Sequence, residues 1–168
     1  MKSLKYVVAL LLLLSLSACG GGGSTPSTQI PTKAVLKLNL TDGGLLFADR
    51  PIIGTVITIT LPANVTPELV NGVIASTVIT PSGTFAGWAV APIYTASTNT
   101  IQMAFVNAAE AGTAVAALVG EVATITLQLA NNAAPTATSF TVSVDSVTDA
   151  GGNTVAGLGA IVSSVTLQ

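Results

Sequence analysis

The stretch Ile57-Thr58-Ile59-Thr60-Leu61 alternates strictly between apolar and hydroxyl side chains. Successive side chains of a β-strand point to opposite faces, so the two isoleucines and Leu61 share one face while the two threonines share the other. One apolar face and one polar face predict a strand in an antiparallel sheet that is covered on one side only.

The same alternation recurs along most of the chain, and it predicts the fold class. It is regular in residues 34–40, 101–105, 123–129, 140–145 and 161–167, and less regular in 73–80 and 90–94. In the last regular run, the pattern places Ile161, Val165 and Leu167 on the apolar face. Glycine, proline and asparagine turns separate the runs. About eight short strands so arranged predict an all-β, antiparallel, two-sheet sandwich or jelly roll.

Two stretches have helical character instead. Residues 67–70 are predicted to form one helical turn, with Thr66 as its cap and Pro67 at the first helical position. Residues 108–119 are rich in alanine and end before Gly120, but Gly112 interrupts them. A helix and an extended loop are both open for that second stretch.

The first eighteen residues have the layout of a secretory signal peptide. Lys2 and Lys5 precede an unbroken apolar run over residues 7–14, and small residues follow it. The run is too short to cross a bilayer, which takes roughly 20 residues. We therefore predict that residues 1–18 are removed on export.

The residues that end this segment, Leu16-Ser17-Ala18-Cys19, resemble the lipobox of bacterial lipoproteins. The alternative is an ordinary signal peptide followed by a chance cysteine. Cys19 is the single cysteine of the chain, and lipidation accounts for an otherwise unpaired thiol in an exported protein. The resemblance implies that Cys19 becomes the first residue and carries the fatty acyl chains that bind the membrane. Gly20 stands where an aspartate would favour inner-membrane retention, which implies attachment to the outer membrane of the cell envelope.

Residues 19–32 are predicted to form a flexible tether of glycine, serine, threonine and proline. As a random coil, about a dozen such residues span on the order of 20 Å. The tether leaves residues 33–168 for one domain, which is long enough for a hydrophobic core of its own.

Charged residues make up only 7% of the chain, far below the roughly 25% of average domains. Beyond the predicted signal peptide, three basic and seven acidic side chains give a net charge of about −4. No basic cluster is present, so nucleic acid is not an expected partner.

Three segments, taken in order, resemble the cohesin family of β-sandwich modules. A strand runs into a proline turn at residues 57–65, a glycine-led strand follows at 120–127, and a strand with its following turn lies at 144–153. The resemblance implies a nine-stranded jelly roll that binds a protein partner, which is a dockerin in cohesins. Leu61 stands where cohesins have tyrosine and aspartate before the proline, so the resemblance supports dockerin binding much less than it supports the fold, and another surface protein is open as the partner.

The chain lacks the side chains that most enzymes use for catalysis. It contains no histidine, which is the commonest general base and metal ligand near neutral pH. Asp42 and Asp49 are the carboxylates nearest in sequence to a glycosidase-like pair, but acidic residues beside glycine usually form turns. The sequence therefore predicts a protein that is not an enzyme.

Asp145, Asp149 and Asn153 surround a glycine turn and offer the oxygen ligands that Ca²⁺ prefers. Their spacing does not match an EF-hand loop, and turn formation explains these residues without a metal. Apart from the lipid on Cys19, no cofactor is predicted, and a structural calcium ion is the weaker alternative.

Aromatic side chains bear on sugar binding, because exposed rings stack on sugar rings. Trp88 and Tyr94 are the candidates, although a buried Trp88 that holds one end of the sandwich is favoured over an exposed one. The sequence thus predicts a lipid-anchored, non-catalytic module of the cell envelope that binds a protein partner. Its alternative is a polysaccharide-binding domain that uses Trp88 or Tyr94.

Overall fold

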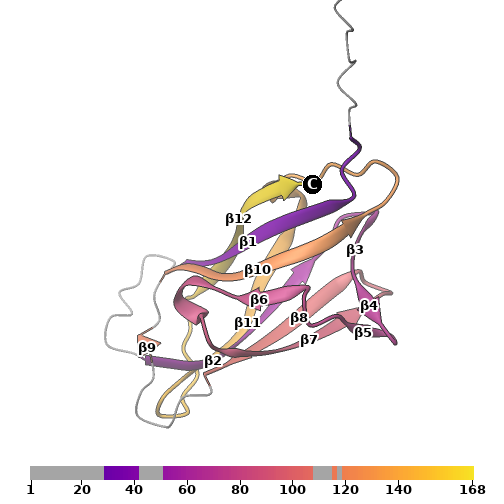
Figure 1. Ribbon diagram of the computed structural model, residues 1–168. Coiled ribbons are helices and arrows are strands. Elements are labelled where there is room, and N and C mark those ends of the chain that lie inside the picture. The colour runs from indigo at the N-terminus through magenta and orange to yellow at the C-terminus, as the bar shows by residue number, and fades with distance from the viewer. Residues whose placement is uncertain (1–28, 42–50, 108–114, 117–118) are drawn as a thin grey trace, which may run out of the picture.

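The computed structural model describes residues 29–41, 51–107, 115–116 and 119–168, which fold as an all-β sandwich (Figure 1). The signal peptide, Cys19 and most of the predicted tether lie outside the described residues, as do Asp42 and Asp49. Within the described part, no helix has the length and apolar character needed to cross a membrane.

The first sheet, sheet A, is built around a central antiparallel pair of strands. Its order is β12 (Gly159–Leu167), β1 (Lys33–Thr41), β10 (Gly120–Leu129) and β3 (Val65–Pro67), with β6 (Ile79–Pro81) pairing with another part of β10. The strand that begins the domain therefore pairs with the strand that ends it.

The second sheet, sheet B, faces the first across the core. Its order is β11 (Thr141–Asp149), β2 (Pro51–Thr60), β8 (Thr100–Val106) and β7 (Ala89–Thr95), and β9 (Val115–Ala116) pairs with the start of β2. A separate hairpin of β4 (Leu69–Val70) and β5 (Val73–Ile74) lies between β3 and β6 in sequence.

The predicted alternation is confirmed in the central strands, and it makes the core. Fully buried side chains recur at every second position: Leu36, Leu38 and Leu40 in β1, Ile57 and Ile59 in β2, Ile101, Met103 and Phe105 in β8, and Ile125 and Leu127 in β10. Each such side chain contributes about 1.5–3 kcal/mol through burial. The core is therefore a double layer of mainly aliphatic rows to which both sheets contribute.

The predicted phase of the last strand is wrong at Ile161, because a β-bulge interrupts the strand, whereas Val165 packs against the core as predicted. Lys37 pairs with Ser164 and Leu38 with Val162, so Ser163 is an extra residue opposite β1. The bulge changes which side of the strand faces the core. Val162 is buried as a result, whereas Ile161 is 50% exposed.

The predicted helical turn at residues 67–70 is also wrong. Pro67 ends β3, and residues 69–70 form β4, which pairs with β5. The asparagine-glycine turn between β4 and β5 explains the difference, because Asn71 and Gly72 both have positive φ, as the common two-residue hairpin requires. Of residues 108–119, only β9 and Val119 are described, so the choice between helix and loop falls mainly outside the described residues.

The described residues form twelve strands where about nine are predicted, because irregular runs divide into short pieces. The 73–80 run contains β5 and part of β6, which belong to different sheets. The two 3-10 turns, η1 (Gly83–Phe85) and η2 (Ala137–Ser139), are the only helical elements in the described part.

The two ends of the sandwich are distinguished by the strand ends that meet there. At one end, the amides of Thr32 and Lys33 donate to the carbonyl oxygen of Gln168 at 2.7 and 2.9 Å. We call this the tether end, because the predicted tether precedes it in sequence; Figure 1 shows the indigo start of the described chain there. At the opposite end, the far end, Thr41 pairs with Gly159.

Gly83 is predicted to be a critical position of the crossover between the sheets. Its φ is +55°, and a methyl group there would overlap the backbone carbonyl of Glu121 in β10. Gly72 is a matched control, because its φ is +81° but an added methyl group would meet nothing within 4 Å. We expect Gly72→Ala to cost about 1–2 kcal/mol of unfolding free energy from backbone strain, and Gly83→Ala to cost clearly more. Denaturant unfolding of both variants tests this, and equal losses would contradict the predicted overlap.

Candidate functional site

The outer face of sheet B carries short side chains with little charge. We call this surface the sheet B face; it consists of Val56, Thr58, Thr60, Ala91, Ile93, Thr95, Thr100, Gln102, Ala104, Thr141, Ser143 and Asp145. Thr60 pairs with Thr141 on one side and Thr100 on the other, and Thr100 pairs with Thr95. Four threonines from four strands thus form one row across the sheet.

Asp145 is the one charged residue of the sheet B face, and side chains of three strands hold it. Its Oδ2 atom accepts hydrogen bonds from the Thr58 hydroxyl at 2.6 Å and the Gln102 amide at 3.2 Å, and its Oδ1 atom accepts one from Ser143 at 2.9 Å. A bulge in β11 places Asp145 between the pairs Val144–Ile57 and Ser146–Val56.

These hydrogen bonds determine the protonation of Asp145. Partial burial on its own would raise the pKa of the carboxyl group, but the hydrogen bonds from Thr58, Ser143 and Gln102 outweigh it and hold that pKa below its ordinary value. The Asp145 carboxylate is therefore charged at neutral pH, and the three hydrogen bonds orient it.

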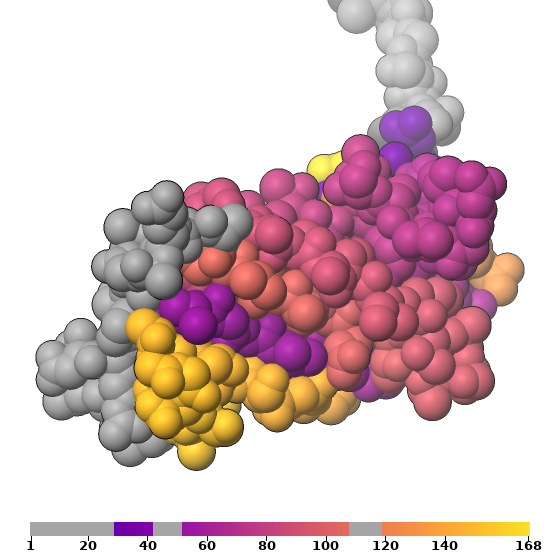
Figure 2. All heavy atoms as spheres, turned by 90° about the horizontal axis from the view of Figure 1, so that it is seen from below, coloured from indigo at the N-terminus to yellow at the C-terminus, as the bar shows by residue number. Residues whose placement is uncertain are grey.

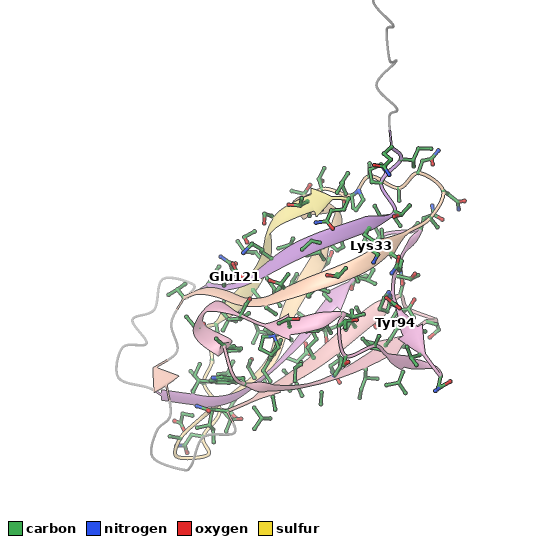
Figure 3. The ribbon with its side chains drawn as sticks, in the orientation of Figure 1. Lys33, Tyr94 and Glu121 are labelled. Atoms are coloured by element: carbon green, nitrogen blue, oxygen red, sulfur yellow. The ribbon has the colours of Figure 1, made fainter. Side chains whose placement is uncertain are left out.

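The outer face of sheet A contains the one ion pair found in the described part of the chain. Lys37 donates from Nζ to Oε2 of Glu121 at 2.6 Å, and Ser82 donates to Oε1 of the same carboxylate at 2.8 Å. These two hydrogen bonds, that from Lys37 first, lower the pKa of Glu121. Figure 3 shows Glu121 and Lys33 toward opposite ends of the β1–β10 pair. The Lys37 and Glu121 side chains are 50% and 27% exposed, so the pair is a surface contact of small energetic value.

Trp88 is buried, which confirms the favoured interpretation and rules out the exposed ring at this position. Only 7% of the residue is exposed, and the indole stacks on Phe85 with ring centroids 4.0 Å apart and planes 4° apart. Phe85 also packs against Phe105 of β8, with ring centroids 5.4 Å apart. The aromatic cluster fills the crossover from β6 to β7, so Trp88 is not accessible to stack on a sugar.

Tyr94 is partly buried against the core, and its hydroxyl group is engaged. The hydroxyl donates to Oδ1 of Asn99 at 2.7 Å, and the amide of Asn99 donates to the carbonyl oxygens of Leu61 at 3.1 Å and Pro62 at 3.0 Å. Asn99 therefore connects the β7–β8 turn to the end of β2, and the hydroxyl group of Tyr94, which Figure 3 labels, holds the Asn99 side chain.

Asp149 and Asn153 form a turn, and Asp145 belongs to a different hydrogen-bond network. Oδ1 of Asp149 accepts from the backbone amides of Gly151 at 2.9 Å and Asn153 at 2.8 Å. The Asn153 side chain turns its amide nitrogen, rather than its oxygen, toward Asp149. Among the described residues, no three acidic, histidine or cysteine side chains gather as a metal site.

Sequence reasoning identified Asp145 but missed the residues that hold it. Thr58 and Gln102 lie 87 and 43 positions away in sequence, and only the register of β11, β2 and β8 brings them to the carboxylate. The alternation of Thr58 with the core residues was the available signal for its outward position.

Comparisons of the chain with protein-family models, with curated proteins and with solved structures give no match. The function is therefore inferred from the surfaces of the molecule itself.

The Asp145 network predicts a specific pH dependence of stability. Because its folded-state pKa is lowered, the stabilisation is present above the ordinary pKa of about 3.9 and is lost as the pH falls through the folded-state pKa. Asp145→Asn should lower the unfolding free energy at neutral pH by up to about 1 kcal/mol, because the carboxylate is exposed. The difference from the unmodified protein should vanish in acid.

Glu68→Gln is the matched control, because it removes the same charge from a carboxylate whose hydrogen bond from Gln128 is 3.4 Å long. Urea titrations of both variants between about pH 7 and about pH 3 measure the effect. An Asp145→Asn deficit that persists unchanged in acid would contradict the role given to the carboxylate.

Proposed function

We propose that this protein is a lipid-anchored, non-catalytic interaction module of the cell envelope, and that the sheet B face binds a protein partner. The observation that supports the proposal best is the character of that face. Its side chains are short, and the fixed Asp145 is its single charge. Short side chains lose little conformational entropy on docking, and few charges must be desolvated.

The contrast between the two outer faces supports the choice of sheet B. Sheet A exposes lysine side chains at 33 and 37 and pairs Lys37 with Glu121. Long, flexible charged side chains are costly to order and desolvate in an interface. Sheet B presents no lysine among its described residues, so it is the better docking surface.

We further propose that the sandwich is a jelly roll related to cohesins. Supporting features are the pairing of β1 with the final strand β12 and the location of consecutive long strands, β1 and β2 or β10 and β11, in different sheets. The partner is then a dockerin-like or other surface protein. The absence of histidine from the whole sequence supports a binding role over catalysis.

The anchor part of the proposal rests on the lipobox-like sequence before Cys19, with attachment to the outer membrane. Three acyl chains hold a protein stably, whereas one gives only marginal binding. We expect Cys19→Ala to move the protein from the membrane fraction to the soluble fraction, or to leave its signal peptide uncleaved. Fractionation followed by mass measurement of the chain tests this, with Ser17→Ala as the control that keeps the cysteine. Membrane retention of a normally processed Cys19→Ala chain would contradict lipid anchoring.

The docking part is tested by site-specific photo-crosslinking of the full chain in the cells that make it. A photoreactive residue at Thr60, in the centre of the threonine row, should give an adduct of discrete mass with a protein. The matched control is Thr166, which is also an exposed threonine and lies on the outer face of sheet A. Ala91→Arg, which adds a long cation to the exposed edge of the sheet B face, should abolish the Thr60 adduct. Equal adducts from both positions, or none from Thr60, would refute docking at sheet B.

A further inference from the structure

Next to the sheet B face, the described part of the molecule has a cluster of exposed aliphatic side chains at the β4–β5 hairpin. We call it the hairpin patch; it consists of Val70 (55% exposed) and Val73 (64%) of the hairpin and of Ile93 (63%), the residue of the sheet B face that borders it. Val73 and Ile93 line the same shallow hollow of about 200 Å³, so the patch is continuous from the hairpin to β7. An exposed apolar cluster of this kind marks an interaction site rather than packing.

The hairpin packs against the sandwich on the side opposite the valines of this patch. Val70 and Val73 form the pair next to the turn, and Leu69 pairs with Ile74. Ile74 is only 7% exposed and belongs to the core, so it holds the hairpin in place. The two valines, on the opposite face of the hairpin, are left in solvent.

The patch lies in the half of the sandwich from which the tether leaves. Lys33, the first residue of β1, pairs with Gln128, and Gln128 pairs with Thr66 in β3. Two strand spacings, about 10 Å, therefore separate the tether exit from β3, and three residues of extended chain from Thr66 to Leu69 add at most about 10 Å. In Figures 1 and 2 the indigo start of the domain and the magenta hairpin region both lie toward the right of the sandwich; in Figure 1 the start is at the top of that side and the hairpin is at the bottom.

The hairpin patch contains no charged side chain. Its nearest charged neighbour in sequence is Glu68, whose carboxylate accepts a hydrogen bond from Gln128 of sheet A at 3.4 Å. The turn itself is Asn71-Gly72, which is polar but neutral. A neutral apolar projection fits the boundary between headgroups and acyl chains of an uncharged lipid, and it needs no anionic headgroup.

We propose that the hairpin patch lies in the surface of the membrane that carries the anchor, as a second, non-covalent contact. This inference rests on the lipid anchor at Cys19 proposed above. Cys19 is fourteen positions before Lys33, and a flexible segment of that length spans on the order of 20 Å, which matches the distance from the tether exit to the hairpin. Three partly exposed aliphatic side chains offer much less than the roughly 800 Å² per partner of a stable protein interface, which favours lipid over a second copy.

The experiment places a polarity-sensitive fluorophore on the hairpin of the full, lipidated chain. Val70→Cys introduces one reactive thiol, because Cys19 is blocked when it carries lipid and no other cysteine exists. Ala156→Cys, at an exposed position in the β11–β12 connection at the far end, is the matched control. Both proteins are reconstituted into phosphatidylcholine vesicles with and without spin-labelled phosphatidylcholine. We expect the emission from position 70 to shift to the blue and to lose most of its intensity to the spin label, at low and high salt alike. Position 156 should show neither effect.

Three results would overturn the proposed hairpin contact, and a fourth result would bear on the lipid anchor alone. Emission from position 70 that equals that of the unlipidated Cys19→Ala, Val70→Cys chain in solution excludes membrane contact. A blue shift without quenching by the spin-labelled lipid means that a second copy covers the hairpin. Quenching that is equal at both positions means that the domain lies on the membrane without a preferred side. Incorporation of two fluorophores per chain shows instead that Cys19 is free, which refutes the anchor rather than the hairpin contact.

Discussion

The sandwich depends on one constraint: each central strand must bury one row of aliphatic side chains while exposing the other row. In β1, the leucines at 36, 38 and 40 are at most 1% exposed, and residues between them face solvent. One side of each sheet faces the core and the other faces solvent. A shift of the pairing by one residue would exchange the two sides, so the register is fixed. Thr55 is the single buried polar side chain of the described part, and its hydroxyl donates to the carbonyl oxygen of Ser146 at 3.0 Å.

The same constraint explains which parts of the fold the sequence could predict. Strict alternation identified the central strands and their inward faces, because period two has no other regular interpretation. It failed where a residue is inserted. Ser163 in β12 shifts the phase, and Val122 in β10 is extra between the pairs Leu38–Ala123 and Asn39–Glu121, so that Val122 and Ala123 are both buried. A bulge is set by what lies opposite on the neighbouring strand, and a single strand's sequence does not contain that information.

At the candidate surfaces too, features set by nearby residues could be predicted from the sequence, whereas contacts between distant segments could not. The burial of Trp88 was predictable, because a domain without disulfides needs large apolar side chains in its core. Its stacking on Phe85 and the contact of Phe85 with Phe105 were not, since they depend on how the β6–β7 crossover packs on β8. The exposed hairpin was missed for another reason. Pro67 and Glu68 favour the first turn of a helix locally, whereas Asn71-Gly72 and the burial of Ile74 stabilise two strands instead.

The low number of charged side chains bears on both proposed surfaces, because it affects how the protein would behave in solution and at a membrane. A freely diffusing domain with few charges, exposed valines and a hydroxyl-rich sheet has weak electrostatic protection against self-association. Attachment to a membrane changes that situation, because a surface contact made by the hairpin patch would remove its apolar side chains from water. The hairpin lies in the tether half of the sandwich, and the sheet B face extends from there toward the far end along β2 and β8 (Figure 2). A contact at the hairpin would therefore limit the tilt that the predicted tether would allow, and would keep the row of threonines in a constant relation to the membrane to which we propose the protein is anchored.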